Sequence, residues 1–103
     1  MEGENFVSLK GYVQWPELRV VGVNNSKLFK GKLAIPVGEF KHYIKIAAWN
    51  ELAEGLDALP EGAFIHVHGH IEERSYDSSC KHCNGAIKMY WTEVVVDNFV
   101  HLA

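Results

Sequence analysis

The sequence predicts an all-β fold, a barrel of five strands with one short helix between the third and fourth strands. Apolar and polar residues alternate with a period of two over most of the chain, which is typical of strands. Turn-forming residues separate the alternating stretches. A single segment has helical spacing, and it follows directly after a strand.

A single domain covering residues 1–103 is expected, because a chain of 103 residues can bury its own core without disulfides. Hydrophobic residues make up 48% and charged residues 22% of the chain, which are ordinary globular values. No apolar run is long enough to cross a membrane, and no signal peptide opens the sequence. We therefore expect an intracellular protein.

Three strands are predicted in the first half of the chain. They cover residues 6–13 together with 18–23, then 27–37, and then 43–49. The segment Trp15-Pro16-Glu17 interrupts pairing within the first strand. In the second strand, Leu33 and Ile35 point inward while Lys30 and Lys32 share the other face.

The third strand has two different faces. A small aliphatic face suited to the core is formed by Ile44, Ile46 and Ala48. The opposite face carries two aromatics with a lysine between them: Tyr43, Lys45 and Trp49. This face is either a surface that stacks bases and meets phosphate, or two half-buried aromatics beside a solvated lysine.

The second half of the chain is predicted to hold a helix and two further strands. Leu52, Leu56 and Leu59 have helical spacing, and Asn50 is expected to cap the helix. Strands over residues 64–76 and 88–100 are joined by a hairpin tip at 77–87, and their inward residues are Ile65, Val67, Gly69, Ile71, Val94 and Val96. This order of elements is that of the OB-fold, a five-stranded Greek-key barrel that binds oligonucleotides.

Basic residues are concentrated in one part of the chain, although the net charge is −3. The segment from Lys10 to Lys45 contains seven basic and two acidic residues. One part of the fold can therefore be positive while the whole is negative. Lys30 and Lys32 are candidates for phosphate contacts, with ordinary solvated lysines as the alternative.

Five segments resemble the bacterial and phage single-stranded-DNA-binding protein family. They are WPELRVV (15–21), LAIPV (33–37), YIKIAAWNELAE (43–54), FIHVHGHIEERSY (64–76) and YWTEVVVDNF (90–99). Together they span nearly the whole chain in the order found in the family. The resemblance implies an OB-fold that binds single-stranded DNA, assembles as a homodimer or homotetramer, and works in the cytoplasm of a bacterium or a phage-infected cell.

The resemblance also assigns roles to individual residues. The family's base-stacking aromatics fall on Tyr43, Trp49 and Tyr76, and the nearest candidate for a fourth is Phe40. Its arginines fall on Arg19 and Arg74. With the lysines expected to meet phosphate, the predicted DNA-binding residues are Tyr43, Trp49, Tyr76, Phe40, Arg74, Lys45, Arg19, Lys30 and Lys32.

The chain departs from the family pattern in three places. Asn50 stands where the family usually has glycine, and Glu51 stands where it usually has lysine, which removes one positive charge. The sequence ends at Ala103 without the Gly/Pro/Gln-rich segment and acidic tip through which bacterial members recruit replication proteins. We therefore expect a phage, truncated or specialised member.

The remaining rings have less specific interpretations. Trp15 and Trp91 are interpreted as packing residues at strand ends. His66, His68 and His70 alternate on one strand face, a spacing that can chelate a transition metal. Such a row is more often a packed or hydrated surface, and a subunit interface is a natural place for it.

Cys80 and Cys83 form a C-x-x-C pair followed by Asn84-Gly85, which resembles one knuckle of a structural zinc site. Zinc needs four ligands, and no second C-x-x-C exists in the chain, so His82, distant histidines, water or a partner's cysteines must complete the set. A zinc shared by two protomers is the more consistent geometry. A redox pair and two free thiols are the alternatives. No other cofactor is expected.

A non-enzymatic protein is the favoured reading. No serine has a placed general base, and no glycine-rich phosphate loop is present. The expected function is sequence-tolerant coating of single-stranded DNA in replication, recombination or repair. An OB-fold assembly module that binds protein instead of nucleic acid is the alternative, and a metal- or thiol-dependent activity at the C-x-x-C hairpin comes third.

Overall fold

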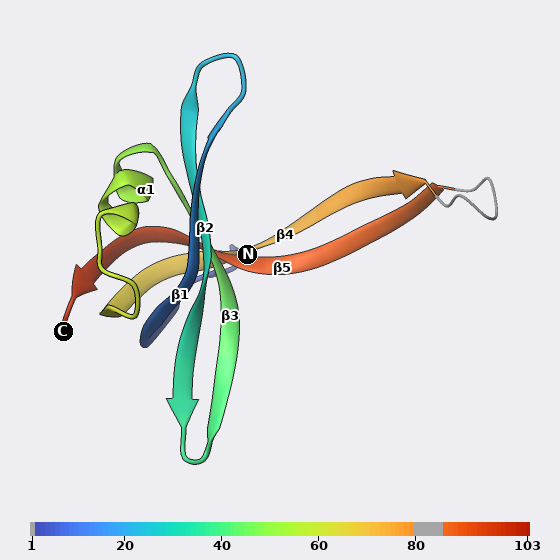
Figure 1. Ribbon diagram of the computed structural model, residues 1–103. Helices are drawn as coiled ribbons and strands as arrows, with labels where there is room; N and C mark the ends of the chain where they lie inside the picture. Colours follow the sequence, from blue (N-terminus) through green and yellow to red (C-terminus); the bar gives the residue numbers. More distant parts are fainter. Residues whose placement is uncertain (1, 80–85) are drawn as a thin grey trace.

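The computed structural model describes the backbone of residues 2–79 and 86–103 and the side chains of residues 2–75 and 90–103. The elements are β1 (Val7–Val21), β2 (Ser26–Val37), β3 (Phe40–Trp49), α1 (Asn50–Asp57), β4 (Phe64–Ser79) and β5 (Ala86–His101) (Figure 1). The strands form a closed barrel in the order β1-β2-β3-β5-β4. Neighbouring strands are antiparallel except β3 and β5, which are parallel. The predicted five-stranded OB-fold barrel with one short helix is confirmed.

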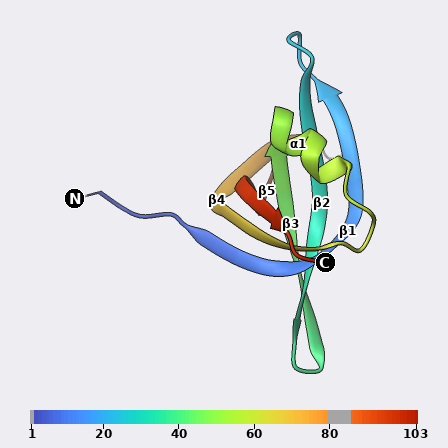
Figure 2. The same ribbon diagram turned by 90° about the vertical axis from the view of Figure 1, so that its left-hand side faces the viewer.

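The core fills the barrel and continues under the helix. Its largest fully buried side chains come from four strands and α1, and they are Val13, Phe29, Leu33, Ile46, Leu56, Ile65 and Val67. The helix lies against the barrel next to β2 and β3 (Figure 2), and Ala53 and Leu56 join the same core. The predicted inward positions Val94 and Val96 are also buried. Because this apolar interior is removed from water, it stabilises the barrel and leaves the outer strand faces for other roles.

A break inside β1 shapes one side of the barrel. Gln14 pairs with Lys32 and Glu17 pairs with Lys30, and the register shifts between them. Trp15 lies at this break with φ 49°, in the left-handed region, directly before Pro16. The predicted interruption of pairing within a single first strand is therefore confirmed.

Two local predictions were wrong. Asn50 does not cap the helix: its φ is 54°, Trp49 occupies the N-cap position, and the Asn50 Oδ1 atom accepts a hydrogen bond from the Lys27 backbone N–H at 3.2 Å. Asparagine tolerates left-handed backbone better than most residues, which accounts for its place at this positive φ. Ile71 is 47% exposed, because β4 pairs with β1 only as far as Gly69 and then leaves the barrel.

β4 and β5 continue beyond the barrel as a two-stranded arm (Figure 1). Their pairing runs from Ile65 and His101 out to Ser79 and Ala86. The strands are thus longer than the sequence predicted, and they include residues 77–79 and 86–87 of the expected hairpin tip. In the part of the chain that the structure describes, no helix is both long and apolar enough to cross a membrane.

Candidate functional site

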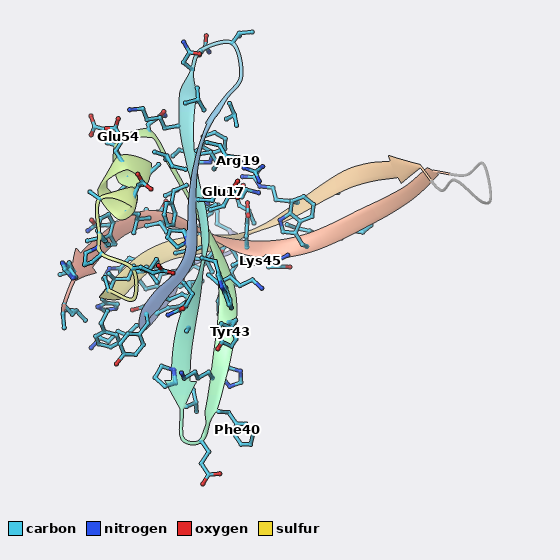
Figure 3. The ribbon with its side chains drawn as sticks, in the orientation of Figure 1. Glu17, Arg19, Phe40, Tyr43, Lys45 and Glu54 are labelled. Atoms are coloured by element: carbon cyan, nitrogen blue, oxygen red, sulfur yellow. The ribbon has the colours of Figure 1, made fainter. Side chains whose placement is uncertain are left out.

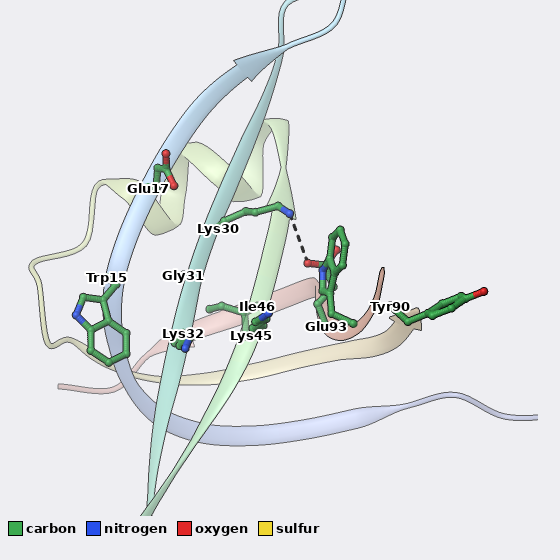
Figure 4. A pocket seen from close by; sticks show the side chains of 10 residues that line it. Trp15, Glu17, Lys30, Gly31, Lys32, Lys45, Ile46, Tyr90 and Glu93 are labelled. Atoms are coloured by element: carbon green, nitrogen blue, oxygen red, sulfur yellow. Dashed lines mark ion pairs between the residues drawn. The ribbon is translucent and has the colours of Figure 1, made fainter. Parts of the chain in front are cut away.

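A groove runs across the outer face of β1, β2, β3 and β5 (Figure 4). Its volume is about 490 Å³, within the range of clefts that hold ligands. The side chains that line it are aromatic (Trp15, Tyr90, Trp91), cationic (Lys30, Lys32, Lys45), acidic (Glu17, Glu93) or small and apolar (Gly31, Ile46). We refer to this surface as the groove.

Two lysines that form no ion pair with any described residue lie side by side in the groove. Lys32 on β2 pairs in register with Lys45 on β3, so their side chains share one face. Among the described residues neither makes an ion pair, and their ammonium groups instead lie 5.4 Å from the Trp15 ring and 6.0 Å from the Trp91 ring. Like charges in register destabilise a sheet. A bound polyanion would relieve that repulsion.

Glu93 forms a buried anionic floor beneath the third lysine. Its side chain is 4% exposed, and it accepts a hydrogen bond from Arg74 Nε at 3.0 Å. Lys30 Nζ lies 3.8 Å from its other carboxylate oxygen, and also 5.5 Å from the Trp91 ring. A buried carboxylate needs such partners to offset its lost hydration. Sequence reasoning missed this residue, because β5 alone gives no sign that cations of β2 and β4 cover it.

Both tryptophans that the sequence assigned to packing line the groove. Trp15 is 59% exposed, so its interpretation as a packing residue was wrong. Its positive φ costs on the order of 1–3 kcal/mol for a residue with a side chain. Trp91 on β5 is half-buried and also lines the groove. The sequence feature that could have marked Trp15 as a groove residue was its position at a strand break, directly before proline.

A second hollow of about 430 Å³ adjoins the groove. It shares Lys45, Trp91 and Glu93 with the groove and adds Tyr43, Ile44, Ile71, Thr92 and Val94. The Trp15 and Tyr43 rings also approach each other, with centroids 5.5 Å apart and planes tilted by 35°. The exposed rings and lysines of β1, β2, β3 and β5 therefore form one continuous surface.

The structure brings together part of the predicted DNA-binding set. Tyr43, Lys45, Lys30 and Lys32 line the two hollows, and Arg74 lies beneath them on Glu93. Phe40 is 73% exposed but lies at the far β2–β3 hairpin (Figure 3).

Trp49 and Arg19 are not among the described residues that line the two hollows. Trp49 is 38% exposed at the end of β3, where it pairs with Leu28. Tyr76 pairs with Met89 on the arm, and its side chain lies outside the described part.

Arg19 is already held by a carboxylate. Its Nε and Nη2 atoms donate to the two oxygens of Glu17 at 2.8 Å and 3.0 Å. This bidentate pair lowers the pKa of Glu17 and raises that of Arg19, mainly through the hydrogen bonds. A phosphate would have to displace Glu17 to use this arginine.

The predicted metal ligands receive no support from the described residues. Cys80 and Cys83 lie outside them, so the zinc site stays a prediction. Among the side chains of residues 2–75 and 90–103, no group of three or more His, Cys, Asp or Glu could hold a metal ion. His66, His68 and His70 instead contact neighbouring side chains, which makes their row a packed surface.

Comparison with known proteins finds a match in fold but none in sequence. No protein-family model and no curated protein matches the chain in sequence. The fold matches the wild-type single-stranded DNA binding protein from Thermus aquaticus with a TM-score of 0.75, and a deletion mutant of that protein with 0.76.

The chain has the fold of that DNA-binding protein. Both matches cover 100% of this chain at 23% identity. They cover 44% and 45% of the Thermus chains, so this chain spans less than half their length. At this identity the likeness establishes the OB-fold, which the element order of the sequence predicted.

Proposed function

We propose that this protein binds single-stranded DNA without strong sequence preference, as a non-catalytic protein of replication, recombination or repair in a bacterial or phage-infected cell. The observation that carries the proposal is the groove, where Lys32 and Lys45 share one face, lie among aromatic rings and have no acidic partner in the described part of the chain. Single-strand binding requires this combination, because rings stack on bases of any kind and lysines follow the phosphates. The likeness of fold to the Thermus protein supports the same reading.

In this proposal the bound DNA strand follows the two hollows and reaches the aromatic residues that lie beyond them. Tyr43 lies in the second hollow, while Trp49, Phe40 and Tyr76 extend the path along β3 and the arm. The resemblance of the sequence to single-stranded-DNA-binding proteins supports a stacking role for these four residues. It also supports assembly as a homodimer or homotetramer, which light scattering of the free protein tests.

The deciding experiment is a salt titration with labelled oligo-dT and a duplex of equal length. Each phosphate neutralised on a single strand contributes about 0.7 to the slope of log K against log salt. Contacts by Lys30, Lys32 and Lys45 alone therefore predict a slope of about −2. Equal affinity for duplex and single strand, or no dependence on salt, would refute the proposal and leave the protein-assembly role.

A further inference from the structure

We infer that Trp15 and Trp91 are base-stacking residues, which hold unpaired bases at the two sides of the groove. This inference rests on the proposed function and extends it to two side chains that neither the sequence pattern nor the resemblance selected. The evidence is the backbone at Trp15, the position of Trp91 and the lysines between them.

Trp15 is held in a conformation that packing does not explain. A residue with a large side chain rarely adopts a φ of 49°, and here it does so at the register break of β1. The ring is 59% exposed, so core burial offsets little of this strain. The result is that the ring lies at the edge of the groove, beside Tyr43 and with Lys32 Nζ at 5.4 Å. Strained residues of this kind cluster at ligand sites.

Trp91 occupies the point where the two hollows meet. It lines both of them, and Lys30 and Lys45 hold their ammonium groups 5.5 Å and 6.0 Å from its ring. These distances are near the outer limit of a cation–π contact, so the contacts are weak. A base can therefore stack on the indole while the lysines turn to the adjoining phosphates.

The arrangement places rings at the sides and cations in the middle. Figure 4 shows Trp15 on β1 at one side, Glu93 and Tyr90 on β5 at the other, and the lysines of β2 and β3 between them. A single strand alternates flat apolar bases with charged phosphates, and this order of side chains complements it. A peptide of mixed charge would gain little from three lysines gathered this closely.

Fluorescence of single-tryptophan proteins tests the inference directly. The chain has three tryptophans, so W49F/W91F leaves Trp15 alone and W15F/W49F leaves Trp91 alone. Stacking of thymine on an indole quenches its emission and shields it from acrylamide. We expect both proteins to be quenched by oligo-dT, with saturation at the same concentration as binding measured by anisotropy.

Substitution gives a second, independent measurement. Trp15→Gly suits the positive φ, so the variant folds without backbone strain and a loss of affinity reports the missing ring. We expect Trp15→Gly and Trp91→Ala each to weaken oligo-dT binding about 10- to 100-fold, as for other stacked bases. The matched control is Phe6→Ala, which removes a 72% exposed ring that stacks on His68 outside the groove, and it should change affinity less than about twofold.

The outcomes separate this inference from the proposed function. If wild-type protein binds oligo-dT but neither single-tryptophan protein responds, and both substitutions behave like Phe6→Ala, the inference is wrong and the proposed function stands. If wild-type protein does not bind oligo-dT, both are wrong. Quenching is decisive for Trp91 even if Trp91→Ala is unstable, because the reporter protein retains that ring.

Discussion

The groove and the outer face of β1 and β4 both carry rings and ionisable groups, but their polar groups find different partners. On the β1–β4 face, which we call the histidine face, Ser8 Oγ lies 2.6 Å from His66 Nε2, and the His66 and His68 rings are 4.2 Å apart. His70 is held from both sides, by Asp97 at 2.9 Å and Glu72 at 2.6 Å. These polar side chains are therefore already hydrogen-bonded within the protein.

In the groove the cations are gathered without a matching set of acids. Lys32 and Lys45 face each other in register, and the described residues give them rings instead of carboxylates. Lys30 shares Glu93 with Arg74. Aromatic rings and charged side chains therefore do not make a binding surface by themselves. What matters is whether the charges are already neutralised inside the protein.

The two regions are also physically joined by a chain of ion pairs. It runs from Asp97 through His70 and Glu72 to Arg74, and from there through Glu93 to Lys30. A change at one end can therefore be compared with a change at the other in the same protein.

The largest effect on stability should come from adding a side chain at Gly69, which is tightly packed next to the histidine face. A Cβ atom on Gly69 would lie 2.1 Å from the Val95 carbonyl oxygen, a distance that the backbone must change to relieve. Gly69→Ala should lower the free energy of unfolding by at least about 3 kcal/mol in urea titrations. In the groove, Gly31→Ala meets its nearest atom at 3.2 Å and should cost less than about 1 kcal/mol. Similar costs at both sites would contradict this difference.

The second effect should come from the buried carboxylate of the groove. Glu93→Gln leaves Arg74 and Lys30 without their buried anion and should cost about 1–3 kcal/mol of stability. The same change should tighten binding of oligo-dT, because the carboxylate of Glu93 no longer competes with phosphate for Lys30. The control is Glu17→Gln, which breaks an exposed pair with Arg19 and should change stability much less than Glu93→Gln does. Weaker DNA binding by a folded Glu93→Gln variant would show that the carboxylate positions Lys30 instead of competing for it.

The third effect should separate binding from stability. The double variant Lys32→Gln/Lys45→Gln should reduce the salt slope for oligo-dT by about 1.4, for two lost phosphate contacts. Its free energy of unfolding should not fall, because the substitution removes a like-charge pair worth about 0.2–1 kcal/mol.

The charge-matched control for this variant is Lys10→Gln/Lys27→Gln. Lys10 pairs in register with His66, and Lys27 pairs with Glu54 of α1, so both lie outside the groove. This control variant has the same net charge as Lys32→Gln/Lys45→Gln and should keep the wild-type salt slope for oligo-dT. An equal loss of slope in both double variants would mean that overall charge, and not the groove, sets the salt dependence.

The smallest effect concerns the histidine face and depends on pH. Hydrogen bonds to Asp97, and then to Glu72, raise the pKa of His70 above its ordinary value. A raised folded-state pKa means that this stabilisation is complete below the unfolded pKa of about 6.5 and is lost as pH rises through the folded pKa. His70→Gln should therefore have a lower melting temperature than wild type at pH 5.5 and the same melting temperature at pH 9. The corresponding loss in the free energy of unfolding at pH 5.5 should be below about 1 kcal/mol.

His66 acts in the opposite sense, which makes the comparison necessary. Desolvation, with help from His68 and Lys10, lowers the pKa of His66, so its contribution is lost as pH falls. This contribution is common to wild type and His70→Gln and cancels in their difference. A difference between the two proteins that stays constant with pH would contradict the role of the His70 charge.

The sequence determined the barrel and the faces of its central strands. Alternation at Leu33, Ile46, Ile65 and Val67 predicted the buried face, because a period of two places these side chains on one side of a strand. The same alternation placed Lys32 and Lys45 outward, since each lies on the strand face opposite to these apolar residues. Such features depend only on neighbours along the chain, and they were therefore readable without the tertiary structure.

The tertiary structure decided which outward residues meet. The partners Lys32 and Lys45 come from the β2–β3 register, and the cover over Glu93 comes from β2 and β4, which lie more than a dozen residues away along the chain. The exposure of Trp15 follows from a left-handed residue at a strand break, and that of Ile71 from the point where β4 leaves β1. Register, breaks and the ends of pairing depend on contacts between distant segments, so a pattern along one strand does not contain them.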